Sequence, residues 1–184
     1  MVFIVLIIIA VVLIAAYVTM YNGLQRSKVQ VDESWSQIDV QLKRRNDLIP
    51  NLVSTTKGYA EHEQETLTKV IALRNQLTQV PDDARQEKMA VSNQITDTLK
   101  SVFALSENYP DLKADTNFLK LQEELTNTEN KISYARQLYN SCVASFNQKL
   151  VTIPTNIVAN MHHMKQVKYL ETQESEKAVP KVEF

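Results

Sequence analysis

An uncharged apolar segment opens the sequence and limits how the rest of the chain can fold. From Val2 to Tyr21 it reads VFIVLIIIAVVLIAAYVTMY, and none of these side chains carries a charge. An α-helix rises about 1.5 Å per residue, so roughly 20 residues cross the ~30 Å hydrocarbon layer of a bilayer. Residues 1–22 are therefore predicted to form a transmembrane anchor, which makes the lipid bilayer the first expected partner.

Two other interpretations of this segment fit it less well. A cleaved secretory signal has a basic start, a shorter apolar core and a small-residue cleavage site. Here no Lys or Arg precedes the run, and Ala15 and Ala16 follow Ile14 without a clean site. A core helix of a soluble domain is rarely so uniformly apolar. We therefore expect a retained single-pass anchor.

The basic residues around the span predict its orientation, because Lys and Arg resist translocation and mark the cytoplasmic side. The nearest ones, Arg26 and Lys28, follow the span, and a Lys-Arg-Arg cluster lies further on. This asymmetry predicts an N-terminus outside the cell and a C-terminal domain in the cytoplasm.

Charge and cysteine content exclude several classes of protein. The 20 basic and 21 acidic side chains give a net charge of -1 and are spread along the chain. Such a balance provides no field for nucleic acid, so none is expected as a partner. The single cysteine, Cys142, can form neither an internal disulfide nor a thiolate metal cage.

After the anchor, apolar residues recur at intervals of three and four, which is the spacing of one face of a helix. The first stripe contains Trp35, Ile38 and Leu42 and keeps its register if Arg45 and Thr56 occupy inward positions. The same register continues to Leu77. It predicts one long first helix that reaches from the membrane to about residue 79.

Pro81 ends this helix, and Asp82 or Asp83 is expected to cap the next one, a shorter helix around residues 91–103. The sequence NYPD at 108–111 marks another turn. The most regular stripe follows it, with inward residues Phe118, Leu121, Leu125, Thr128, Ile132, Ala135, Tyr139, Cys142 and Phe146.

Near residue 153 the sequence IPTN ends the third long helix and places Thr155 as the cap of a short final helix. The predicted fold is therefore all-α: an N-terminal transmembrane helix, then an elongated antiparallel helical bundle or coiled coil of three long helices and one short C-terminal helix. The bundle domain is expected at 23–170 and a charged flexible tail at 171–184. Narrow apolar faces leave much lateral surface, which predicts a homo-oligomer.

Residues 38–53, IDVQLKRRNDLIPNLV, interrupt the first stripe with charge and with a helix breaker. Proline inside a helix costs roughly 3 kcal/mol, but Ile49 would be a poor cap for a new helix. A kink within one helix is the better interpretation. The surface around it is the candidate interaction site, with residues Lys43, Arg44, Arg45, Asp47 and Pro50.

The same residues have a plainer interpretation. Lys43 and Arg44 would be solvated surface, Arg45 would extend from the inward face to water, and Asp47 would pair locally. The alternative role is docking of another chain or of anionic lipid headgroups. Nearby acidic residues dilute the positive charge and weaken the lipid hypothesis.

No catalytic or metal-binding pattern stands out. His62-Glu63 lacks the second histidine four residues later that a helical zinc site needs. His162 and His163 are adjacent, so a helix would direct them about 100° apart. The carboxylates, Glu124 and Glu129 among them, read as solvated faces, and Cys142 reads as a small buried hydrophobe. We expect no enzyme, no metal and no cofactor.

Several segments together closely resemble the LemA family of bacterial membrane proteins. The resemblance lies in YNGLQ at 21–25, SWSQIDVQLKRRNDLIPNLV at 34–53, GYAEHE at 58–63, ENYPDLKAD at 107–115, FLKLQEELTNTENKISYARQLYN at 118–140, FNQKL at 146–150 and IPTNIVA at 153–159. It implies one N-terminal span in the bacterial inner membrane, a cytoplasmic domain of long helices and no established activity. It also implies a link with membrane metallopeptidases or other envelope proteins. His162 and His163 depart from the aromatic or glycine residues more usual in the family.

Three functions follow as hypotheses. The first is a membrane-anchored helical scaffold or adaptor that associates with itself or holds an envelope protein. The second is a sensory or regulatory bundle that binds a small ligand between helices or controls an envelope protease. A hydrolytic or metal enzyme fits least. A deep pocket between helices would favour the second, and a filled interior would favour the first.

Overall fold

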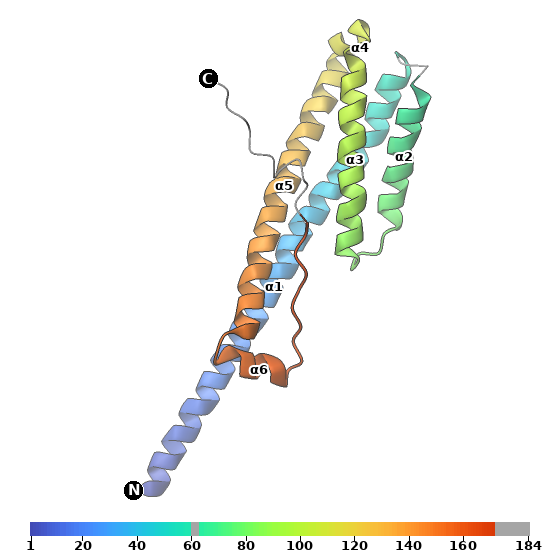
Figure 1. Ribbon diagram of the computed structural model, residues 1–184. Helices are drawn as coiled ribbons and strands as arrows, with labels where there is room; N and C mark the ends of the chain where they lie inside the picture. The colour runs from blue at the N-terminus through green and yellow to red at the C-terminus, as the bar shows by residue number, and fades with distance from the viewer. Residues whose placement is uncertain (60–62, 172–184) are drawn as a thin grey trace, which may run out of the picture. The chain divides into compact units, whose positions relative to one another are not determined.

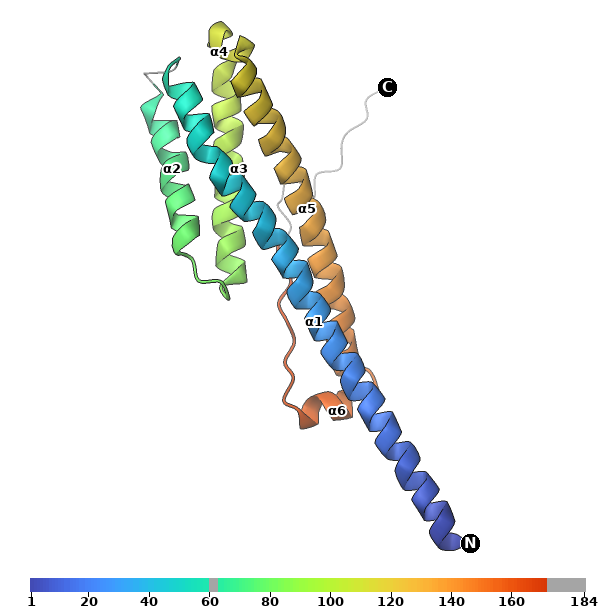
Figure 2. The ribbon, with the colours of Figure 1, turned by 180° about the vertical axis from the view of Figure 1, so that it is seen from behind.

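The computed structural model describes residues 1–59 and 63–171 of the chain. The described residues contain no strand, which confirms the predicted all-α class (Figures 1 and 2). The helices are α1 (Val2–Lys57), α2 (Gln64–Gln79), α3 (Arg85–Ser106), α4 (Pro110–Ala114), α5 (Thr116–Val151) and α6 (Thr155–Met161). The predicted tail, 171–184, lies outside the described residues apart from Glu171.

Helix α1 passes unbroken through Pro50, as the sequence predicts, but it ends at Lys57 and not near residue 79. Gly58 follows the last helical residue, and glycine is about 1 kcal/mol less favourable than alanine inside a helix. The inward residues of α2, such as Val70 and Leu73, are buried. A helix that continued straight on would hold this stripe away from the other helices, whereas a reversal of the chain lets it pack.

The chain divides into two compact units, and α1 and α5 each contribute to both. Among the described residues, unit 1 comprises Met1–Gln37 and Ala135–Tyr169, and unit 2 comprises the rest, from Ile38 to Tyr134 together with Leu170 and Glu171.

Unit 2 contains four helical segments side by side: the second part of α1, then α2, α3 and the first part of α5 (Figures 1 and 2). They alternate in direction, and the short α4 connects the last two. The core of unit 2 is mainly apolar. The predicted inward residues Ile38, Leu42, Leu125 and Ile132 are at most 2% exposed. The unit is thus a four-helix bundle, because the predicted first helix is two helices.

Unit 1 is built around the inward faces of α1 and α5. The rings of Trp35 and Tyr139 meet edge to face, with centroids 6.0 Å apart and an angle of 70° between planes. Both rings are buried, as is Phe146 further along α5. The sequence predicted Cys142 as a buried inward residue, but Cys142 is only half-buried. Its neighbour Val143 occupies the inward position instead, so the prediction was wrong by one residue.

The predicted helix caps also differ from those observed. Neither Asp82 nor Asp83 caps α3, whose N-cap residue is Ala84 with no side-chain cap bond. Thr155 is the first residue of α6, and its hydroxyl lies 2.6 Å from the Lys149 carbonyl oxygen, where it can donate.

Asp115, which no sequence pattern pointed to, accepts from the backbone N–H groups of Asn117 and Phe118 at the start of α5, at 2.8 and 2.9 Å. The bond from Phe118 is the largest influence that holds the pKa of Asp115 below its usual value. The hydrogen bond from Tyr59 to the same carboxylate correspondingly raises the pKa of Tyr59.

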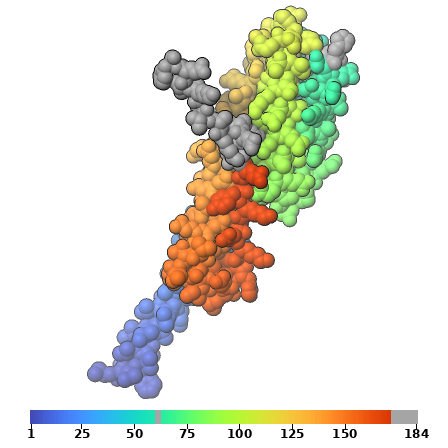
Figure 3. Space-filling model, viewed as in Figure 1, coloured from blue at the N-terminus to red at the C-terminus, as the bar shows by residue number. Residues whose placement is uncertain are grey.

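The N-terminal end of α1 is long and apolar enough to cross a membrane, and its most apolar stretch has a mean hydropathy of 3.2. The large apolar side chains from Val2 to Ile14 are all exposed, and no other described part of the chain covers them on the face drawn in Figure 3. So much exposed apolar surface in water is unfavourable. A hydrocarbon environment removes that penalty, which supports association of this segment with a membrane.

Candidate functional site

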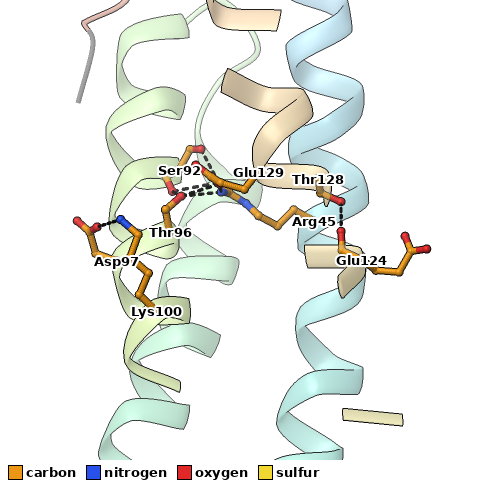
Figure 4. A network of polar contacts seen from close by, with 8 residues as sticks. All are labelled: Arg45, Ser92, Thr96, Asp97, Lys100, Glu124, Thr128 and Glu129. Atoms are coloured by element: carbon orange, nitrogen blue, oxygen red, sulfur yellow. Dashed lines mark hydrogen bonds and ion pairs between the residues drawn. The ribbon is translucent and has the colours of Figure 1, made fainter. Parts of the chain in front are cut away.

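Four side chains from three helices form a polar network inside unit 2 (Figure 4). Arg45 of α1 donates to Glu129 of α5 at 2.6 Å and to the Thr96 hydroxyl of α3 at 2.8 Å. Its second terminal nitrogen donates to the backbone carbonyl of Ser92 at 3.0 Å and also contacts the Ser92 hydroxyl. We call these residues, Arg45, Ser92, Thr96 and Glu129, the Arg45 network.

Burial makes this network costly to disturb. The Arg45 side chain is 1% exposed and that of Glu129 is 28% exposed. An arginine cannot lose its proton in a protein, so its buried charge needs partners. Thr96 lies 2.9 Å from Glu129 as well, and thus helps to fix the carboxylate beside the guanidinium. The network ties α1, α3 and α5 together at one level.

The sequence placed Arg45 on the inward face, and it is there, but two expectations about its surroundings were wrong. Arg45 does not extend to water, and Glu129 is a mostly covered carboxylate that pairs with Arg45. An arginine at an inward position of an otherwise apolar stripe is the sequence feature that indicates a buried polar network. Its partner could not be chosen from sequence because many carboxylates lie on the other helices.

The five residues of the predicted interaction surface point in different directions. Arg45 faces the interior, whereas Lys43, Arg44, Asp47 and Pro50 are exposed. Arg44 pairs with Glu124 of α5 at 2.6 Å, and their side chains are 48% and 47% exposed. Lys43 and Asp47, four residues apart on α1, share a face that lines a cleft.

This cleft lies within unit 2, and its volume is about 410 Å³. Helix α1, helix α2 and the segment around the start of α3 supply its walls. We call it the Lys88 cleft, and its charged and polar lining consists of Asp39, Lys43, Asn46, Asp47, Arg74, Thr78, Asp82 and Lys88.

Lys88 links two of the acidic groups in this lining. Its ammonium group lies 2.9 Å from Asp39 and 2.6 Å from Asp82. Burial is the largest single influence and lowers the pKa of Lys88, but the hydrogen bonds and charges of Asp82 and Asp39 together raise it above its usual value. The hydrogen bond from Lys88 lowers the pKa of Asp82.

Asn46 places an unused hydrogen-bonding atom beside the cleft. The residue is 6% exposed, and its buried side-chain oxygen has no hydrogen-bond partner among the described residues. Leaving a buried acceptor unsatisfied costs about 1–3 kcal/mol. Such a group is a candidate contact for a ligand or for a side chain of another protein.

Within residues 1–59 and 63–171, no three His, Cys, Asp or Glu side chains are grouped so as to hold a metal ion. His62 of the rejected zinc pattern lies outside those residues. His162 belongs to unit 1, where 2.7 Å separate its Nε2 from the Tyr17 hydroxyl of α1.

These features define a class of protein: a helical chain with an apolar N-terminal helix and a four-helix unit whose buried core holds an arginine network. The sequence profile of the LemA family matches residues 34–184, and the chain belongs to this family. The match begins after the apolar segment, which therefore lies outside it.

Two relatives extend the comparison. Protein LemA of Metamycoplasma hominis is 29% identical, and the matched region covers 88% of this chain and 73% of that protein. Magnetosome protein MamQ of Magnetospirillum gryphiswaldense is 20% identical over 84% of this chain and 63% of its own length. The sequence resemblance to the LemA family is thus confirmed.

Proposed function

We propose that the protein is a membrane-anchored helical adaptor with no catalytic activity, which associates with copies of itself and holds another envelope protein. The single observation that carries this proposal is the core of unit 2, where buried apolar side chains and the Arg45 network pack between the helices. A bundle whose core is packed with its own side chains binds partners through its outer surface. A membrane metallopeptidase is one candidate partner, from the family resemblance.

The proposed topology has α1 crossing the bacterial inner membrane with its N-terminus outside. Arg26 and Lys28 follow the span and support a cytoplasmic location for the rest of the chain. The remaining α1 then continues from the membrane directly into both units.

The experiment that tests self-association is native mass spectrometry of the full chain in a mild detergent. We expect a discrete assembly of several 21.0 kDa protomers. The matched control replaces residues 2–16 with an unrelated span known to be monomeric and leaves Tyr17 and everything after it intact. A monomer in both forms would contradict self-association and leave only the adaptor role.

The Lys88 cleft favours a second candidate function, the sensing of a small zwitterionic ligand. Three basic and three acidic side chains line the cleft, and the unpartnered Asn46 oxygen adds an acceptor. A molecule with both charges, such as a free amino acid, would match this lining. In this case the bundle would be a regulatory domain.

We expect Asn46→Leu to leave the free energy of unfolding unchanged or to raise it by up to about 1 kcal/mol, because it removes a buried unsatisfied acceptor. If the cleft binds ligand, the variant should lose the thermal shift that the parent shows with one of the free amino acids. The matched control is Asn51→Leu, at an exposed position of the same helix. No shift of the parent with any amino acid would exclude this ligand class.

A further inference from the structure

Helix α6 and the turn before it expose an apolar surface within unit 1. Ile157 and Met161 are 58% and 63% exposed, and their spacing of four places them on one face of the helix. Ile153, in the preceding turn, is 76% exposed. Val158 and Ala159, on the other face, are buried. The helix therefore packs with one side and leaves a second apolar side that no element of the described residues covers.

Specific contacts fix α6 against α1 just where the apolar segment ends. His162, which follows α6, lies 2.7 Å from the Tyr17 hydroxyl, and its ring centroid is 4.5 Å from that of Tyr21. The Lys149 ammonium group contacts the Ser27 hydroxyl of α1. These contacts join the end of α5 and the end of α6 to residues 17–27 of α1.

The segment after α6 is held as well. Asn147 of α5 makes two hydrogen bonds with the backbone of Val167: its amide nitrogen donates at 2.8 Å and its oxygen accepts at 2.9 Å. The backbone N–H groups of His163 and Met164 donate to Asn160 and Ala159, which closes the C-terminus of the helix. The exposed face is therefore presented in one orientation.

The length of α1 places this surface at a membrane boundary. From Val2 to Tyr17 a helix rises roughly 22 Å, and to Tyr21 roughly 28 Å, against a hydrocarbon thickness of ~30 Å. Tyrosine is enriched at the level of the lipid headgroups. Since His162 contacts both tyrosines, α6 lies at the same level of the helix.

We propose that α6 and its preceding turn form a second membrane contact, with Ile153, Ile157 and Met161 inserted at the boundary between headgroups and acyl chains. The occupant of the exposed face is the lipid surface, because the His162 contacts place α6 beside residues 17–21, where the lipid-exposed segment of α1 ends. Lys165 and Lys168, both exposed, follow α6 and suit anionic headgroups. This inference rests on the proposed span by α1.

Depth-dependent fluorescence quenching tests the contact in the full chain, reconstituted in vesicles of phosphatidylcholine and phosphatidylglycerol. In a Cys142→Ala background, one cysteine is introduced by Ile157→Cys and carries an environment-sensitive nitrobenzoxadiazole dye. The quencher for positions 157 and 137 is a lipid with a nitroxide near the top of its acyl chain, and the quencher for position 11, near the middle of the span, is a lipid with a nitroxide near the end of its acyl chain. Val11→Cys reports the span, and Gln137→Cys, at an exposed position of α5 in unit 1, is the matched control.

We expect the shallow nitroxide to reduce the emission at position 157 more than about twofold, as the deep nitroxide does at position 11, with little change at position 137. Equal, weak quenching at 157 and 137 with strong quenching at 11 would overturn the contact and leave the span intact. A blue-shifted but unquenched dye at 157 would mean that a second copy or another protein covers the face. Absence of quenching at 11 would remove the span, and the inference with it.

Discussion

Replacing Glu129 with alanine is expected to lower the free energy of unfolding by about 3 kcal/mol, because the change leaves the Arg45 charge buried without its carboxylate partner. Arg45 would retain its bonds to Ser92 and Thr96, which are neutral and only partly compensate. Chemical denaturation of the detergent-solubilised chain, followed by far-ultraviolet circular dichroism, measures the difference.

The neighbouring ion pair supplies the control. Arg44 and Glu124 make a contact of the same length between the same two helices, but both side chains are about half exposed. Exposed pairs contribute roughly 0–1 kcal/mol, so Glu124→Ala should have a small effect. Equal losses for the two variants would show that the Arg45 network is no more important than a surface pair.

A double replacement separates the cost of an unpaired charge from the value of the pair. Arg45→Met together with Glu129→Leu removes both charges and keeps similar volume. Buried pairs replaced in this way are often neutral or stabilising. We therefore expect the double variant to recover most of the stability that Glu129→Ala loses.

The second large effect is expected from Tyr139→Ala in unit 1. Tyr139 is 1% exposed and packs edge to face against Trp35. Truncation of a buried aromatic side chain to alanine typically costs about 3–5 kcal/mol, because apolar contacts are lost and a cavity remains. Trp35 is the single tryptophan of the chain, so its emission reports this unit directly. We expect a red shift and a lower unfolding midpoint.

Tyr134→Ala is the matched control for this experiment. Tyr134 lies five residues earlier on α5 and is 70% exposed. Its truncation removes the same atoms from a solvated position and should change stability by no more than about 0.5 kcal/mol. Comparable losses at both positions would contradict the assignment of Tyr139 to the core of unit 1.

The candidate site was only partly predictable. The charged, proline-containing interruption from Lys43 to Pro50 marked the region of α1 that carries the polar contacts. Its residues nevertheless belong to three different features: an interior network, a surface ion pair and a cleft. A helix turns by 100° per residue, so neighbours in sequence face different elements. Lys88 and Asn46 were missed because the lining of the cleft comes from three separate segments of the chain.

The sequence by itself determined the helical class, the apolar N-terminal segment, the continuity of α1 through Pro50 and the inward positions of α1 and α5. These are local properties, since periodicity and length are carried by consecutive residues. Only the tertiary structure decided that α1 stops at Lys57 and that α2 folds back to complete a four-helix unit. It also decided that Glu129, among many similar carboxylates, pairs with Arg45, because a stripe of inward residues has the same spacing whichever helix it packs against.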